Sequence, residues 1–150
     1  MNEPRQVLAG QWVERAESDL LNVANNLGAE QVPRDTVCYH RQQAAEKYMK
    51  AVLVAADRPV PRVHDLGQLL DLLADYVHAL AGDRHELQWL TAWAVGARHP
   101  AEVMDVRPGE EDGRRAHAGA LRVRSVCREY LEASGLALPG ESEGTPAGPA

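Results

Sequence analysis

Polar side chains recur at helical spacing in the segment between Pro33 and Pro59. The four that follow an i, i+3, i+7, i+10 ladder are His40, Gln43, Lys47 and Lys50. At about 100° per residue, they fall within roughly 80° of one another around a helix axis. Two ammonium groups, an amide and an imidazole on one stripe could bind phosphates and the edge of a base. The same spacing also fits an ordinary solvated face, on which Glu46 and Lys50 form an i, i+4 pair.

Two more segments place polar groups at the ends of expected helices. His64 lies beside Asp65, where a helix N-terminus offers free amides to an anion, although Asp65 could cap those amides itself. Arg98 lies two residues before Pro100, after the end of an expected helix. Its guanidinium could contact a phosphate, or it could satisfy the last carbonyls of that helix. The candidate nucleotide- or phosphate-binding residues are therefore His40, Gln43, Lys47, Lys50, His64 and Arg98.

Other chemistry finds no support in the residue pattern. None of the six histidines makes a His-x-x-x-His pair, and none stands at zinc spacing with a cysteine. The sequence contains no phosphate-binding loop. We therefore expect neither a metal site nor a cofactor.

The composition is typical of one globular, helical domain. A chain of 150 residues can bury a core without a metal or a disulfide. Phenylalanine is absent, while alanine and leucine dominate the apolar residues, which favours helices over strands. The formal net charge of −6 disfavours non-specific binding along duplex DNA, because the phosphates repel an acidic protein.

The cellular location is predicted from what the sequence does not contain. Residues 1–10 are polar and mixed, unlike a signal peptide, and no apolar run is long enough to span a membrane. The two cysteines, Cys38 and Cys127, do not form a Cys-x-x-Cys motif. These features predict a cytoplasmic protein with reduced thiols and no membrane contact.

Hydrophobic periodicity predicts an all-α fold, an up-and-down bundle of about five helices. The expected helices cover residues 11–27, 34–57, 65–81, 84–95 and 111–134. On the first helix, Asp19, Asn22 and Asn26 are expected on the side away from the core. On the second, the expected core stripe consists of Cys38, Ala45, Met49, Val52 and Ala56.

The domain boundaries follow from these helices. Residues 1–10 are expected to form a lead-in and residues 11–134 the helical domain. Residues 135–150 are expected to be a disordered tail, because Gly, Pro, Ser, Glu and Thr cannot bury enough apolar surface to order a chain.

The segment Cys38–Ala51 resembles the signature of the HEPN family, a His followed by Gln-Gln-Ala-Ala-Glu-Lys and a second Lys. Three other stretches resemble the family's first helix, the start of its third helix and its Ala-Arg-Tyr-Pro segment; they are Trp12–Leu20, His64–Leu66 and Ala97–Pro100. In the last of these, His99 replaces the aromatic residue. The resemblance covers roughly residues 11–134.

This resemblance implies a helical bundle that is usually a dimer and often has a separately encoded small nucleotidyltransferase as its partner. Some relatives bind nucleotides, and others are RNases of toxin–antitoxin, CRISPR or phage-defence systems. The RNase branch pairs an Arg and a His, four to six residues apart near the final helices, across a dimer.

The spacing of the RNase branch is not found where that branch has it. Near the end of the chain, Arg114 and Arg115 lie too close to His117, and Arg98 and His99 are adjacent. Five residues also separate two pairs earlier in the chain, Arg34 with His40 and Arg58 with His64.

The expected function is therefore that of a nucleotide-binding or nucleotidyltransferase-partnered homodimer in a toxin–antitoxin-like module. One alternative is a metal-independent RNase that uses His40 or His64 with Arg98, and its ligand would be RNA. A non-catalytic adaptor dimer is the other alternative.

Overall fold

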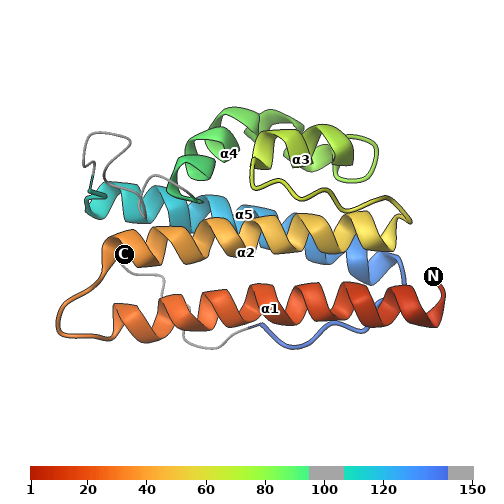
Figure 1. Ribbon diagram of the computed structural model, residues 1–150, viewed down its shortest axis with the longest axis horizontal. Coiled ribbons are helices and arrows are strands. Elements are labelled where there is room, and N and C mark those ends of the chain that lie inside the picture. Colours follow the sequence, from red (N-terminus) through yellow and green to blue (C-terminus); the bar gives the residue numbers. More distant parts are fainter. Residues whose placement is uncertain (95–106, 142–150) are drawn as a thin grey trace.

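The computed structural model describes residues 1–94 and 107–141. The regular elements within these residues are all helical (Figure 1). They are α1 (Glu3–Leu27), α2 (Arg34–Ala55), α3 (Leu66–Leu73), the 3-10 helix η1 (His78–Asp83), α4 (Arg84–Thr91), the 3-10 helix η2 (Ala92–Ala94) and α5 (Glu110–Ala133). The predicted all-α bundle is confirmed.

The long helices α1, α2 and α5 run side by side, with α2 packed against both of the others (Figure 1). The short helices α3 and α4 lie on the side away from α1. Because α2 has neighbours on several sides, it is buried around most of its circumference. Its expected core stripe is buried from Cys38 to Val52, while Ala56 is half-buried just beyond the helix.

Helix α1 begins eight residues earlier than the sequence analysis expected. The side chain of Asn2 caps it by accepting a hydrogen bond from the Arg5 backbone amide at 3.1 Å, and Pro4 fits in its first turn. Ala9 lies fully in the core. Residues 3–10 are therefore part of the bundle, and the expected lead-in is wrong for them.

The third expected helix is split in two. Asp65 caps α3 by accepting a hydrogen bond from the Gln68 amide at 2.9 Å, as its spacing predicts. The α-helix nevertheless ends at Leu73, whose carbonyl accepts hydrogen bonds from the Tyr76 and Val77 amides. Val77 then takes an extended φ of −125° with its side chain buried, and η1 follows. The Val77 side chain is thus buried in the core by a backbone conformation that interrupts the helix, and its β-branched shape suits an extended conformation.

The segment after α5 is packed as far as residue 141. Gly135 adopts a φ of +89°, which turns the chain back, and the Leu136 amide donates to the Leu131 carbonyl at 3.1 Å. Leu136 is buried, and Arg128 donates a hydrogen bond to the Pro139 carbonyl at 2.7 Å. The expectation of disorder is therefore wrong for residues 135–141, and residues 142–150 lie outside the described chain.

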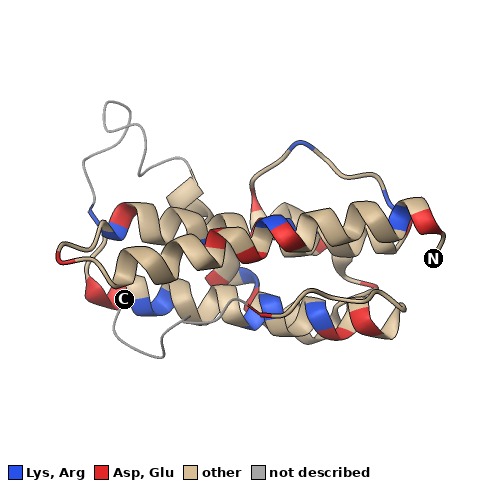
Figure 2. Ribbon diagram, turned by 90° about the horizontal axis from the view of Figure 1, so that it is seen from below, with Lys and Arg blue, Asp and Glu red and all other residues tan. Residues whose placement is uncertain are grey.

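Acidic and basic residues are interspersed along the helices (Figure 2). Across residues 1–94 and 107–141, no helix has the length and apolar character that crossing a membrane requires.

Candidate functional site

The ladder of polar residues on α2 lies on the face between α1 and the segment that leads into α3. We define the polar face as the residues that gather here, namely Asp19 of α1, the α2 residues His40, Gln43, Glu46, Lys47 and Lys50, and His64. The structure thus brings five of the six predicted binding residues to this face, in two groups that the Asp19 and Glu46 carboxylates hold, and Arg98 lies outside the described residues.

At one end of the polar face, a single carboxylate holds two of the predicted residues. Oδ1 of Asp19 lies 2.8 Å from Nδ1 of His40, and Oδ2 lies 2.5 Å from Nζ of Lys47. The His40 and Lys47 side chains are each about one-fifth exposed, at 21% and 22%, whereas Asp19 is nearly buried. The Asp19 carboxylate therefore fixes an imidazole and an ammonium group side by side at the surface.

At the other end, the buried carboxylate of Glu46 serves the same purpose. Its Oε1 accepts a hydrogen bond from Nζ of Lys50 at 2.7 Å, and its Oε2 lies 3.0 Å from Nδ1 of His64. His64 is 62% exposed. The Gln42 side chain donates to the His64 carbonyl at 2.9 Å, which fixes this loop against α2.

Lys50 differs from Lys47 in its access to solvent. Its side chain is only 6% exposed, and Nζ also lies 5.6 Å from the centroid of the Trp12 ring. Lys50 is therefore a buried member of the polar face that supports Glu46, whereas the Lys47 ammonium reaches the surface. Between the two ends, Nε2 of Gln43 donates to Oε1 of Gln42 at 2.7 Å and lies 3.4 Å from Oε2 of Glu46.

The ion pairs define what the polar face can do chemically. Each lysine has a carboxylate partner, so these four groups carry no net charge together. A carboxylate at Nδ1 favours the imidazole form in which Nδ1 carries the proton and Nε2 is left as an acceptor. Among the described residues, no hydrogen bond is recorded for Nε2 of His40 or of His64. Both Nε2 atoms can therefore accept a hydrogen bond from a ligand.

The two carboxylates are the residues that sequence reasoning missed. The placement of Asp19 on the outer side of its helix was wrong, because Asp19 is only 7% exposed. Its spacing contained the signal: Asp19 comes three residues after Ala16 and four before Val23, both of which lie in the core. Glu46 was assigned a surface pair with Lys50, and that pair exists but is buried.

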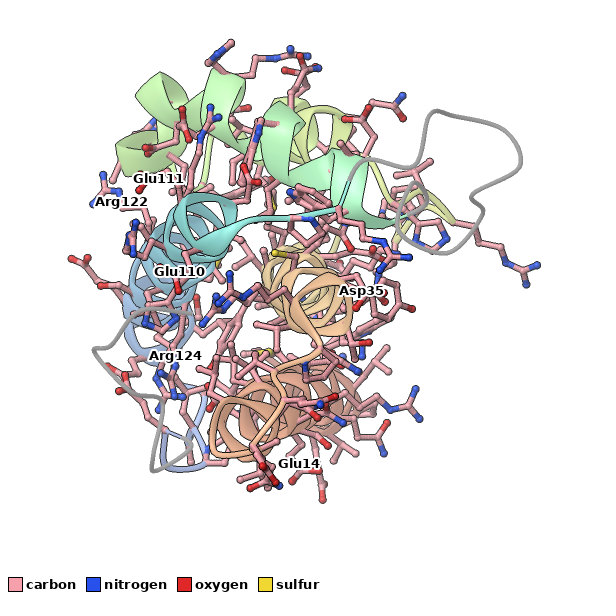
Figure 3. The ribbon with its side chains drawn as sticks, turned by 90° about the vertical axis from the view of Figure 1, so that its left-hand side faces the viewer. Glu14, Asp35, Glu110, Glu111, Arg122 and Arg124 are labelled. Carbon is pink, nitrogen blue, oxygen red and sulfur yellow. The ribbon has the colours of Figure 1, made fainter. Side chains whose placement is uncertain are left out.

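A second polar cluster lies between α1, α2 and α5. Arg124 donates two hydrogen bonds to the Glu17 carboxylate, from Nε at 3.0 Å and from Nη2 at 2.7 Å. The Tyr48 hydroxyl donates to the same carboxylate and accepts from Arg128. Figure 3 looks along the long helices and shows Arg124 on α5. Glu17, Tyr48 and Arg124 are buried, so this cluster joins helices and offers no surface to a ligand.

The structure gives no support for a resident metal within the part of the chain that it describes. No three His, Cys, Asp or Glu side chains gather there as ligands of a metal ion.

Comparison with known proteins identifies the family. The model of the HEPN domain matches residues 9–130, which is most of the chain and includes the whole of α2 and nearly all of α5. No curated protein and no solved structure matches the chain. The family match, the all-helical bundle and the signature on α2 agree with one another. The chain therefore belongs to the HEPN domain family.

Proposed function

We propose that this HEPN protein binds a nucleotide through the polar face. The supporting observation is the pair of side chains held by Asp19, because His40 and Lys47 reach the surface in fixed positions. Lys47 has three N–H donors and gives one to Asp19, so donors are left for a phosphate oxygen. Gln43, between the two ends, is placed to contact a base or ribose.

The charge balance of the polar face limits how tightly it can bind. Both lysines already have carboxylate partners, and the negative charges of Asp19 and Glu46 weaken the attraction between the lysines and a phosphate. We therefore expect a dissociation constant in the micromolar range or weaker.

The binding proposal is tested by calorimetry with ATP and GTP on the wild-type chain and on Lys47→Ala. The expected result is binding to the wild type that weakens at least tenfold in the variant. Arg84→Ala is the matched control, because it removes a cation that is paired with Asp71 on another surface. Absence of heat at millimolar nucleotide, or equal binding by Lys47→Ala, would refute the proposal.

The amine chemistry of the chain provides an independent test. Both lysines of the chain lie on the polar face, and only Lys47 is accessible. An amine-reactive reagent should therefore label Lys47 and the N-terminus while leaving Lys50 largely unmodified. ATP should protect Lys47 and leave the N-terminus as reactive as before. Labelling of Lys47 that ATP does not reduce would place the nucleotide elsewhere.

The proposal includes a biological setting, in which the protein is a homodimer and one component of a toxin–antitoxin-like module. The expected partner is a small nucleotidyltransferase encoded beside it. Light scattering should give twice the 16.4 kDa mass of one chain. Co-expression with an adjacent nucleotidyltransferase should give a complex that co-purifies. A monomer, or a neighbouring gene of another kind, would argue against this setting.

Metal-independent RNA cleavage is the second candidate, and the two carboxylate–histidine pairs favour it. A histidine that is bound through Nδ1 can accept the ribose 2′-hydroxyl proton at Nε2. The 2′-oxygen then bonds to the adjacent phosphorus, the bond to the 5′-oxygen breaks, and that oxygen receives a proton. The products carry a 2′,3′-cyclic phosphate and a 5′-hydroxyl.

RNA incubated with the pure protein and a chelator decides between the two candidates. Cleavage that leaves cyclic phosphate ends and is lost in His64→Ala or His40→Ala would support the RNase. His85→Ala is the control, because His85 is exposed on α4. If the RNA stays intact and the protein binds a nucleotide, the binding function is supported and the RNase is excluded. If the RNA stays intact and no nucleotide binds, the non-catalytic adaptor dimer is the remaining hypothesis.

A further inference from the structure

The most buried charged side chain of the described residues has no counterion there. Arg41 of α2 is 0% exposed and points to the side of α2 that faces α5. Its Nη1 donates to the Gly113 carbonyl at 2.5 Å, in the first turns of α5. Its Nε and Nη2 have no hydrogen-bond partner, and no described residue forms an ion pair with it. Buried donors without partners are rare, because each one forfeits its bonds to water.

The two unpartnered atoms of Arg41 lie on one edge of the guanidinium group. Three other arginines of this chain use the same edge, Nε with Nη2, to bind a carboxylate in two places. These pairs are Arg84 with Asp71, Arg115 with Glu86, and Arg124 with Glu17. This edge fits two oxygens of one anion. In Arg41 the edge is fully buried, and no carboxylate of the described residues occupies it.

A third polar atom belongs to His117, which stands one helical turn after Gly113 on α5, the residue whose carbonyl Arg41 contacts. Nδ1 of His117 is buried and has no hydrogen-bond partner among the residues that the structure describes. Its surroundings are electropositive: burial, followed by the charges of Arg41 and Arg124, lowers the pKa of His117 to about 4. Burial also lowers the pKa of Arg41 to about 10, so its guanidinium still carries its charge at neutral pH. The region thus combines a buried cation with three unused polar atoms.

We propose that Arg41 and His117 form a buried site between α2 and α5 for one tetrahedral oxyanion, a phosphate group. Two oxygens would accept hydrogen bonds from Nε and Nη2 of Arg41. A third oxygen would accept one from Nδ1 of His117, in the form that carries its proton there. A tetrahedral anion offers each of the three donors an oxygen of its own, whereas a carboxylate would have to share one of its two oxygens between two donors. The number of unpartnered donors therefore favours phosphate.

This site is separate from the polar face. On α2, residue 41 lies about 100° around the axis from residue 40, towards α5, whereas the polar face extends from residue 40 in the opposite direction. The phosphate could be free phosphate or the phosphate group of a nucleotide. Either source would bury a negative charge beside Arg41, and either would stabilise the folded chain by binding only to it.

Thermal unfolding in a chloride buffer, with additions at constant ionic strength, tests the proposal. Inorganic phosphate and AMP are the two probes, because they separate free phosphate from a nucleotide phosphate. The wild type should melt several degrees higher in 10 mM of one probe than in chloride alone. Arg41→Met, which fills a similar volume without a charge, should fold and should lose that rise. His117→Gln tests the site without changing Arg41, and it should reduce the rise.

Two controls separate this site from other anion-binding surfaces. Arg84→Met removes an exposed cation and should keep the full rise in melting temperature. Lys47→Ala serves as a comparison with inorganic phosphate alone, because the polar face is itself proposed to bind a nucleotide. A rise that Lys47→Ala abolishes and Arg41→Met retains would assign the anion to the polar face and overturn the proposal. No rise with either probe in the wild type would also overturn it.

Discussion

Loss of Glu17 should destabilise the bundle strongly, because its buried carboxylate joins α1 to α2 and α5. Glu17 is only 6% exposed, accepts two hydrogen bonds from Arg124, and accepts a third from the Tyr48 hydroxyl. Substituting Glu17→Leu would leave the Arg124 guanidinium, which is 6% exposed, without its buried partner. Removing one member of a buried ion pair costs about 3–5 kcal/mol.

That loss is large for a domain of this size. Single domains are stable by about 5–15 kcal/mol, so Glu17→Leu should remove a third or more of the free energy of unfolding. The measurement is urea unfolding followed by circular dichroism at 222 nm. Glu14→Leu is the matched control, because Glu14 is exposed on the same helix, and its effect should stay within about 0.5 kcal/mol.

A double variant distinguishes an uncompensated charge from a loss of packing. In Glu17→Leu/Arg124→Met, both charges of the pair are gone and apolar groups fill their space. Such replacements are often neutral or stabilising, so the double variant should regain at least about 2 kcal/mol over the single variant. A single variant that loses less than about 1 kcal/mol, or a double variant that is less stable than the single one, would refute the reasoning.

Three further predictions concern acid stability, thiols and glycines. Burial lowers the pKa of His117 to about 4 in the folded chain, so between pH 6.5 and 4 the unfolded chain binds a proton that the folded chain does not. The contribution of His117 to the free energy of unfolding should therefore be complete above pH 6.5 and fall towards pH 4. Urea midpoints measured across this range should fall less steeply for His117→Gln than for the wild type. Burial raises the pKa of Cys38 to about 11 and raises that of Cys127 as well, so a thiol reagent at pH 8 should label both in urea and neither in the native chain. Gly135 has a φ of +89°, so Gly135→Ala should lower the free energy of unfolding by about 1 kcal/mol. Gly10 lies within α1, where an added Cβ meets no atom within 4 Å, so Gly10→Ala should raise that free energy by about 0.5–1 kcal/mol. Thermal unfolding measures both changes.

Local patterns predicted the helices well where apolar spacing and caps agreed. The second expected helix begins at Arg34 in the structure and ends two residues before its expected end. The fifth is displaced by one residue at each end. The first and third were less accurate. The cap at Asn2 depends on one side chain, and the break after Leu73 depends on Val77 filling the core, which spacing alone does not reveal.

The candidate site was predictable as far as one helix could show it. The stripe from His40 to Lys50 follows from helical geometry, and the position of His64 follows from the cap at Asp65. The partners on other helices do not follow from it. Asp19 contacts His40 from 21 positions away in the sequence. Glu46 has a partner on its own helix, Lys50, so helical spacing gives no sign that it also contacts His64. The burial of Arg41 was not predicted, because arginine side chains are rarely fully buried without a charged partner.

The pair of Glu17 and Arg124 also bears on the order in which the bundle folds. These residues are 107 positions apart, whereas α1 and α2 are joined by a short connection and pack directly on each other. Closing the longer loop costs more chain entropy, so the α1–α2 hairpin should form first and α5 should dock onto it later. Substitutions at Glu17 would then act mainly on the unfolding rate and leave the folding rate nearly unchanged. The buried ion pair between α1 and α5 would thus be among the last contacts to form.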